Sequence, residues 1–291
     1  ELPQRFDVGI NYFNQGLEGK GNSDSPEVAA SRTNYFRETY AYGNDIKAPG
    51  IEPFLEHPEL SRTAKAISGC SNVVPAIVYA NLLIPGQELA IHTDVPEFRG
   101  ANRKIVPQWL LVVMLHSGLF EKWRIPIVTC VSWFGDAKGG AFTFYPEGAN
   151  GKRSAISAQH NSAILIDTDM TFHGVERVAG GLPDLALIGK KTRLHFCGET
   201  TWELRESKEV IDTFSWSDIR YSISWKAYCF ADDEAEALWE SGIDTLSTTD
   251  ILGILEAALR ARGLLKVARP NPTELALLLV DTFVKYPTTA Y

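Results

Sequence analysis

Short apolar runs separated by Gly, Pro and Asn fill the middle of the chain, from about residue 73 to residue 204. Runs of this length that are rich in β-branched and aromatic residues are typical of strands, and many of them in succession favour a sandwich or a barrel. Pro85-Gly86 has the composition of a type II turn, so the runs on either side of it are expected to pair as a hairpin. The predicted strands are 73–84, 87–94, 109–116, 125–134, 141–145, 162–167, 175–178 and 193–196.

The chain before these strands mixes polar and apolar residues. Residues 16–25 are rich in Gly, Ser and Asn, which indicates a loop. A helix is expected over 26–42, because Pro26 suits the first turn of a helix. We therefore expect residues 1–72 to form a mixed α/β region that packs on the β core.

The last third of the chain follows helical spacing. Apolar residues between Ile251 and Leu259 recur every three or four positions, which predicts an amphipathic helix. Asn271-Pro272 then has the residues of a helix start, with Asn271 as the cap. Residues 275–284 are strongly apolar, so this second helix is expected to pack on the β core or against a second subunit.

These patterns predict an α+β chain in three regions: 1–72, a mainly β core at 73–204, and a mostly helical extension at 205–291. With 45% apolar and 22% charged residues, the composition is ordinary for a soluble globular protein. No run approaches the roughly 18 apolar residues of a membrane span, and the first residues lack the features of a signal peptide. We expect a cytoplasmic protein without a membrane partner.

Charge and cysteine content narrow the classes of function further. The formal net charge of −8 disfavours nucleic acid as a partner, because binding to phosphates requires clustered Lys and Arg. The four cysteines are far apart and form no CxxC pair, so free thiols in a reducing compartment are expected.

The predicted strand at 87–94 ends in His92-Thr93-Asp94. Because side chains alternate across a strand, His92 and Asp94 project from the same face and can share one metal ion. With a second histidine from another strand, this pair would leave three positions of an octahedral ion open. That arrangement suits the non-heme Fe(II) oxygenases.

Two later segments extend the pattern: residues 139–146, GGAFTFYP, form a Gly-opened strand, and residues 172–175 read FHGV. The order of an HxD pair, a Gly-Gly-aromatic strand and an HGV histidine resembles that of the Fe(II)- and 2-oxoglutarate-dependent dioxygenase superfamily. The resemblance covers residues 73–196. It implies a double-stranded β-helix, a cupin-like jelly-roll barrel whose open end holds the metal. It also implies that His92, Asp94 and His173 are the metal ligands and the catalytic residues.

The same resemblance implies Fe(II) and 2-oxoglutarate as cofactors, with ascorbate as an assisting reductant. The far carboxylate of 2-oxoglutarate needs a buried cation, and arginine suits it best because its fork can bond both oxygens. In the family this cation follows the second histidine, often as Arg-x-Ser. The expected match is Arg193-Leu194-His195, which has His in place of Ser and a longer gap than usual. The rival cations are Lys190, Lys191 and Arg177.

Tyr79 and Asn81 share one face of the strand before the Pro-Gly turn, and we expect them to lend polar groups to the co-substrate. The segment 95–106 is polar and contains glycine, so it is a candidate lid over the substrate. The expected substrate contacts are Phe98, Arg99, Arg103 and Phe172, with the two arginines meeting a substrate carboxylate.

The implied reaction is oxidation of an unactivated C–H bond of a small molecule by hydroxylation, desaturation or cyclisation, with release of succinate and CO2. Asp94 argues against halogenation, because halogenases of this superfamily carry a small residue at that position. The expected partners are this small molecule and O2, and a homodimer through the C-terminal helices is a further expectation.

Two alternatives stay open at the level of sequence. The first is an iron oxidase of the same fold that does not use 2-oxoglutarate, which the imperfect match at Arg193 motivates. The second is a metal-dependent hydrolase or isomerase, or a ligand-binding jelly roll, because two histidines and a carboxylate also suit zinc.

Overall fold

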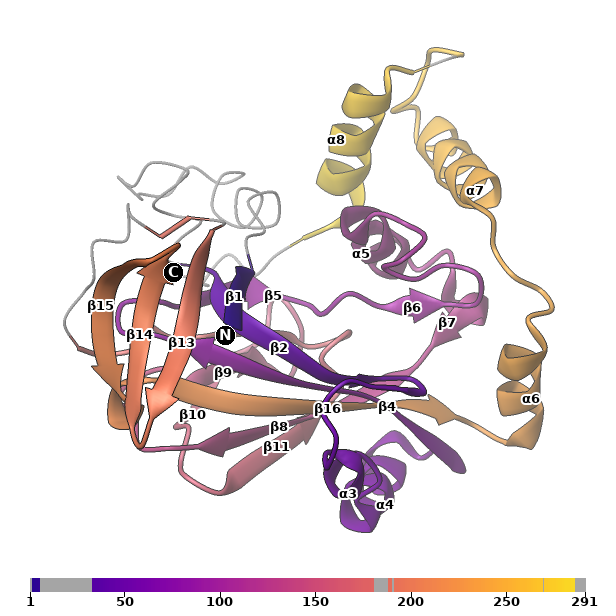
Figure 1. The fold of residues 1–291 in the computed structure, drawn as a ribbon. Helices are drawn as coiled ribbons and strands as arrows, with labels where there is room; N and C mark the ends of the chain where they lie inside the picture. The colour runs from indigo at the N-terminus through magenta and orange to yellow at the C-terminus, as the bar shows by residue number, and fades with distance from the viewer. Residues whose placement is uncertain (1, 6–32, 181–187, 190, 269, 286–291) are drawn as a thin grey trace.

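The computed structural model describes residues 2–5, 33–180, 188–189, 191–268 and 270–285 (Figure 1). The loop predicted at 16–25 and the first part of the helix predicted at 26–42 lie outside the described residues. The described part is mainly β, as predicted, with helices added at both sides of the sheets. Among these residues no helix is long and apolar enough to cross a membrane.

The largest element of the described structure is a ten-stranded antiparallel sheet. Its strands run in the order β11-β8-β16-β4-β2-β1-β13-β14-β15, and β3 pairs with β2. The strands of this sheet are β1 (Leu2–Arg5), β2 (Tyr35–Tyr42), β3 (Asp45–Ile46), β4 (Asn72–Leu83), β8 (Ile127–Phe134), β11 (Ser162–Ile166), β13 (Thr192–Gly198), β14 (Thr201–Glu206), β15 (Glu209–Ser215) and β16 (Arg220–Phe230).

A second, four-stranded sheet has the order β10-β9-β12-β5. A separate pair joins β6 to β7. These strands are β5 (Leu89–His92), β6 (Glu97–Phe98), β7 (Arg124–Ile125), β9 (Phe142–Tyr145), β10 (Ser154–Ile156) and β12 (Phe172–Val175).

The chain passes repeatedly between the two sheets, and this corrects the predicted hairpin. β4 pairs with β16 and β2 in the large sheet, whereas β5 pairs with β12 in the small one. Pro85-Gly86 does form a turn, with Gly86 at a φ of 84°, but the turn carries the chain from one sheet to the other. The hairpin prediction was wrong because a turn signal does not specify which strand becomes the partner.

Apolar side chains from both sheets pack against each other. Leu83 of the large sheet lies in one buried cluster with Val175 of the small sheet, and Val131 and Trp133 of the large sheet lie in another with Phe142. The two sheets therefore face each other across a shared core. Burial of such side chains contributes about 25 cal/mol per Å² of apolar surface removed from water.

Two helices, α3 (Glu52–Leu55) and α4 (Pro58–Ser68), cover the other face of the large sheet (Figure 1). They pack on Val78 and Trp225, and the Trp225 indole Nε1 donates a 2.7 Å hydrogen bond to the carbonyl of Leu55. Because side chains alternate along β16, the residues on either side of Trp225 face the small sheet instead.

The segment predicted as a strand at 109–116 is a helix, α5 (Gln108–Ser117). It begins after Pro107 and ends at Gly118, whose φ of 69° terminates the helix. Leu110 to Leu115 are all buried. An element that is apolar on every side has no period that distinguishes a helix from a strand, which is why the prediction was wrong.

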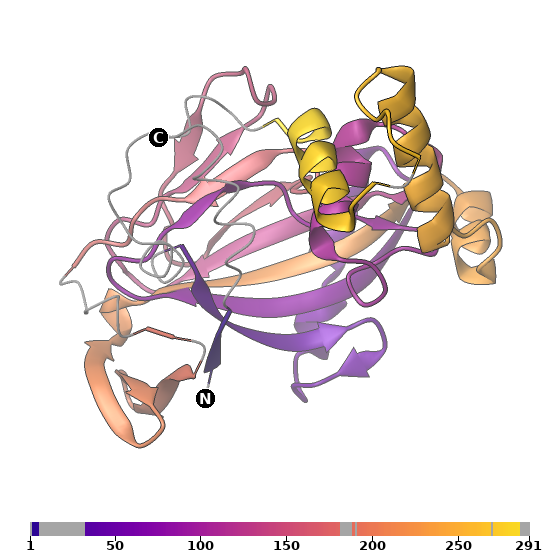
Figure 2. The ribbon, with the colours of Figure 1, turned by 90° about the horizontal axis from the view of Figure 1, so that it is seen from above.

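The predicted C-terminal helices are present as α7 (Thr248–Ala261) and α8 (Pro272–Phe283), preceded by α6 (Asp233–Ser241). Asn271 caps α8 as predicted, accepting hydrogen bonds from the amides of Thr273 and Glu274. α8 packs on α5, and α7 shares one buried cluster with both helices (Figures 1 and 2). We call α5, α7 and α8 the helical lobe; its buried cluster also contains Phe98 of β6, and none of the cluster's residues lies in the large or the four-stranded sheet. Two short 3-10 helices complete the elements, η1 (Glu121–Trp123) and η3 (Trp216–Asp218).

Two segments depart from the predicted regions. The helix predicted over 26–42 is replaced at its C-terminal end by β2, whose aromatic residues suit a strand and which has partner strands on both sides. The β structure also continues past residue 204, because β16 lies in the large sheet between β8 and β4.

Candidate metal centre

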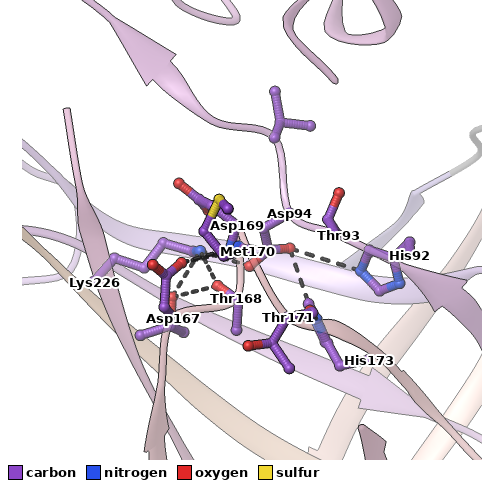
Figure 3. A network of polar contacts seen from close by, with 12 residues as sticks. His92, Thr93, Asp94, Asp167, Thr168, Asp169, Met170, Thr171, His173 and Lys226 are labelled. Carbon is purple, nitrogen blue, oxygen red and sulfur yellow. Dashed lines mark hydrogen bonds and ion pairs between the residues drawn. The ribbon is translucent and has the colours of Figure 1, made fainter. Parts of the chain in front are cut away.

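His92, Asp94 and His173 come together at one end of the small sheet. β5 and β12 are antiparallel neighbours, and His173 lies directly opposite His92 in their register. Asp94 follows two residues after His92, and its Oδ1 lies 3.7 Å from Nε2 of His92 and 3.9 Å from Nε2 of His173 (Figure 3). One donor atom from each residue lies within 4.8 Å of the others, so the three fit the HxD…H triad.

Backbone carbonyls orient both imidazoles. Nδ1 of His92 donates to the carbonyl of Ala90 at 2.8 Å, and Nδ1 of His173 donates to the carbonyl of Thr171 at 2.9 Å. A proton held at Nδ1 leaves the lone pair on Nε2, which is the atom that faces Asp94. Burial, and then the neighbouring His92, lower the pKa of His173 to about 4, so His173 is neutral and able to coordinate at neutral pH.

Asp94 is paired with a buried lysine from the large sheet. Nζ of Lys226 lies 2.6 Å from Oδ2 of Asp94, the oxygen that faces away from the histidines. Burial alone would raise the pKa of Asp94, but Lys226 and the two histidines hold it well below the ordinary value. Asp94 is therefore an anion at any physiological pH.

The triad opens onto a cavity between the two sheets that is partly open to solvent. Its walls combine apolar residues with hydroxyl, amide and charged groups. The lining residues are Tyr35, Tyr79, Asn81, Leu83, Leu89, His92, Asp94, Thr129, Val131, Phe142, Thr168, His173, Val175, Arg220, Ser222 and Ser224.

Arg220, at the start of β16, places a buried guanidinium in this cavity. Its side chain donates through Nε to the carbonyl of Gly140 at 2.6 Å and through Nη1 to Ser222 at 3.5 Å. Nη2 is buried and has no hydrogen-bond partner among the described residues. Burial lowers the pKa of Arg220 to about 9, which still leaves it protonated at neutral pH.

The close contact between Gly140 and Arg220 explains the second glycine of the Gly-Gly pair. A Cβ at Gly140 would lie 2.5 Å from Cδ of Arg220, and its φ of 62° is itself unfavourable for other residues. Glycine at this position therefore makes room for the arginine.

The structure does not bring Arg193 to this cavity. Arg193 lies on β13, where it is opposite Arg205 of β14, and it is not among the lining residues. Of the rival cations, Arg177 pairs with Glu88, Lys191 is exposed, and Lys190 lies outside the described residues. Sequence reasoning missed Arg220, although Arg220-Tyr221-Ser222 has the Arg-x-Ser pattern that it sought.

Tyr79 and Asn81 do line the cavity, from β4. Oδ1 of Asn81 is buried and has no partner among the described residues. The Tyr79 ring is covered by the guanidinium of Arg37, whose central carbon lies 3.6 Å from the ring centroid. Both residues therefore line the cavity next to the triad, as expected. Their role toward a co-substrate stays a prediction.

The four residues expected to contact substrate lie outside this cavity. Phe98 is buried in the helical lobe, and Arg99 forms a 3.1 Å ion pair with Asp244. Nη2 of Arg103 lies 3.4 Å from the carbonyl of Val95. Phe172 stacks on His116 at 5.5 Å, because it points to the opposite face of β12 from His173. Their roles toward a substrate stay predictions.

No family model matches the sequence, and no curated protein matches it. The structure is similar to that of an oxidoreductase of the 2OG-Fe(II) oxygenase family from Burkholderia pseudomallei, with 10% identity, 68% of this chain and 69% of that chain covered, and a TM-score of 0.40. It is also similar to a Pseudomonas putida prolyl-4-hydroxylase, with 10% identity, 79% and 93% covered and a TM-score of 0.36. A third similar structure is AviO1 from Streptomyces viridochromogenes Tue57, with 13% identity, 78% and 80% covered and a TM-score of 0.36.

Proposed function

We propose that this protein is a non-heme Fe(II)- and 2-oxoglutarate-dependent oxygenase. It would oxidise an unactivated C–H bond of a small molecule with O2 and release succinate and CO2. One observation carries the proposal: a cluster of two histidines and a carboxylate opens onto the same cavity as a buried arginine with an unpartnered Nη2.

The donor set fits Fe(II). His92, Asp94 and His173 offer two imidazole nitrogens and one carboxylate oxygen, and three further positions of an octahedral ion would stay open. Iron and 2-oxoglutarate, when bound, supply the oxidising power that no protein side chain has. The protein's own part is to hold, orient and shield these groups.

Arg220 fits the far carboxylate of 2-oxoglutarate. A buried guanidinium is costly unless an anion pairs with it, and a carboxylate is the anion that its planar fork matches best. Ser222, two residues further on the same face of β16, adds a hydroxyl beside it. Tyr79 and Asn81 would complete the polar wall, while Leu83, Val175 and Phe142 exclude water from the rest.

The order of the strands supports a double-stranded β-helix as the fold. Eight strands divide into β11-β8-β16-β4 in the large sheet and β10-β9-β12-β5 in the small one. The chain moves between the two groups along the sequence and returns to the first with β16. In this proposal β13, β14 and β15 are an insertion between the strand of His173 and the strand of Arg220.

The first test is anaerobic addition of Fe(II) and then 2-oxoglutarate to the purified protein. A weak visible charge-transfer band that needs both additions is expected for the wild type. It should be lost in His173→Ala. If the wild-type protein develops no band, the proposal fails.

The second test is a substrate screen under O2, read by succinate formation and product mass. A gain of one oxygen indicates hydroxylation, and a loss of two hydrogens indicates desaturation or cyclisation. The donor set also suits zinc. Hydrolysis by the Zn2+ form without oxygen uptake would favour the hydrolase alternative, and oxygen uptake without succinate would favour the oxidase.

A further inference from the structure

The ammonium of Lys226 lies directly behind the metal centre. Lys226 is only 3% exposed, and its Nζ contacts the outer oxygen of Asp94 at 2.6 Å (Figure 3). A buried lysine is unusual, because the loss of hydration of a charged ammonium is costly without close partners. Its contact with a metal ligand therefore calls for a functional explanation.

Three acceptors fix the position of this ammonium. Besides Asp94, it donates to Oγ1 of Thr129 at 2.9 Å and to Oγ1 of Thr168 at 3.1 Å. The two hydroxyls are 2.7 Å apart and hydrogen-bond each other. An ammonium has three N–H donors, so these three contacts satisfy all of them.

Asp94 is fixed from its backbone as well. Its amide donates to the carbonyl of Thr168 at 2.9 Å, and the hydroxyl of Thr168 accepts a bond from the same Lys226 ammonium that holds the Asp94 side chain. The carboxylate is left with Oδ1 toward the two histidines and Oδ2 toward Lys226.

A carboxylate can bind a cation through one oxygen or through both. If Asp94 bound through both oxygens, it would occupy one of the three positions that an oxygenase leaves open. Two of these are for the two oxygens of 2-oxoglutarate that chelate the metal, and the third is for O2. We propose that Lys226 is a positioning residue that occupies Oδ2 of Asp94, restricts this ligand to one oxygen and so preserves the third open position. The inference rests on the proposed function of the site.

The experiment uses Co2+ as the probe, because its visible spectrum reports the number and arrangement of ligands without turnover. Lys226→Met removes the ammonium and keeps most of the apolar stem. The buried carboxylate of Asp169 interacts electrostatically with both Lys226 and Asp94, and without Lys226 it would keep only the weaker attraction of Arg103. The variant is therefore made together with Asp169→Asn, and Asp169→Asn alone is the matched control.

We expect the Co2+ spectrum of the double variant to differ from those of the wild type and of Asp169→Asn. The affinity of its Co2+ form for 2-oxoglutarate should fall at least about tenfold, which corresponds to about 1.4 kcal/mol. A crystal structure of the Co2+ form should show both oxygens of Asp94 on the metal. An unchanged spectrum, or one-oxygen coordination in the crystal, would overturn the inference.

Thr129→Val gives a second test that keeps the buried charge and covers the case in which the double variant does not fold. It removes one of the three acceptors, and we expect a smaller change of the spectrum in the same direction. No change in Thr129→Val, when only this variant is folded, would also overturn the inference. If wild-type protein binds no Co2+, or binds it equally well in His92→Ala, the proposed metal centre itself is wrong.

Discussion

Arg220 and Arg193 are two arginines on strands that follow His173, and only Arg220 lines the cavity. We expect Arg220→Leu to weaken 2-oxoglutarate binding by about tenfold to a hundredfold, because a hydrogen-bonded charge pair contributes about 1.5–3 kcal/mol. Arg193→Leu, the matched control, should change the affinity by less than about twofold. Titration of the anaerobic Fe(II) form measures both. The opposite pattern would return the role to Arg193.

The clustering of His92, Asp94 and His173 could be predicted from the sequence, whereas the arginine of their cavity was missed although Arg220-Tyr221-Ser222 has the pattern that was sought. Alternation along a strand places His92 and Asp94 on one face wherever the strand lies, so the pair is a local property. The position of Arg220 is not local, because three strands lie between β12 and β16 along the chain. A search that moves forward from His173 meets Arg193 first, on a strand that pairs elsewhere.

His116, near the end of α5, is a residue whose proton affinity depends on folding. Its ring stacks on Phe172, and burial lowers the pKa of His116 to about 4. The unfolded chain binds a proton near pH 6.5, so stability from this group is complete above that pH and is lost as the pH falls toward 4.

We expect the difference in unfolding free energy between the wild type and His116→Gln to change by about 3 kcal/mol between pH 7 and pH 4, because each pKa unit corresponds to about 1.4 kcal/mol. The variant loses less stability on acidification. Urea unfolding of the metal-free proteins at several pH values measures this. Parallel pH profiles would show that the imidazole is not protonated on unfolding.

At the scale of elements, the sequence pattern predicted where several strands lie but not which strands pair with each other. Val73 to Ile84 could be predicted as a strand because its β-branched run is long, and β4 follows it closely. The pairing of β4 and β5 with other strands depends on the whole topology, which a single turn does not contain. α5 could not be distinguished from a strand, because its buried residues surround its axis.

The segment that follows Asp94 is held against Leu246 of the C-terminal third of the chain at Gly100. A Cβ there would lie 2.6 Å from both the backbone nitrogen and oxygen of Leu246, and its φ is 83°. Gly118 has a similar φ of 69° but nothing within 4 Å. Gly118→Ala should cost about 1 kcal/mol from backbone strain alone.

Gly100→Ala should cost at least about 2 kcal/mol, because the new methyl group must also displace a backbone. The measurement is the free energy of unfolding in urea for both variants. Equal losses would show that the contact between Gly100 and Leu246 is loose enough to adjust.

At the scale of the molecule, the helices of the helical lobe share one buried cluster with the segment around Phe98. Its outer surface exposes apolar side chains, including Leu277, which is 50% exposed. A homodimer through these helices stays a prediction.

If that dimer forms, Leu277→Glu should shift the protein to monomers, because two charges would be placed in an apolar contact. Val210→Glu is the control, since Val210 is 46% exposed on β15, outside the lobe. Sedimentation velocity over a range of concentrations measures the association. A wild-type protein that stays monomeric throughout would contradict the prediction.

The residues of the candidate metal centre are translated in a fixed order, and the strand behind them comes last. His92, Asp94 and His173 have all been translated by residue 173. The strand β16, which carries Arg220 and Lys226 and joins β8 to β4, is translated last among the core strands. Until β16 emerges, the nascent sheet consists of two halves and the ligand carboxylate has no ammonium behind it. If the proposed iron site is correct, newly made chains should become able to take up the ion in one late step, and fragments that stop before residue 220 should not hold it in a defined environment.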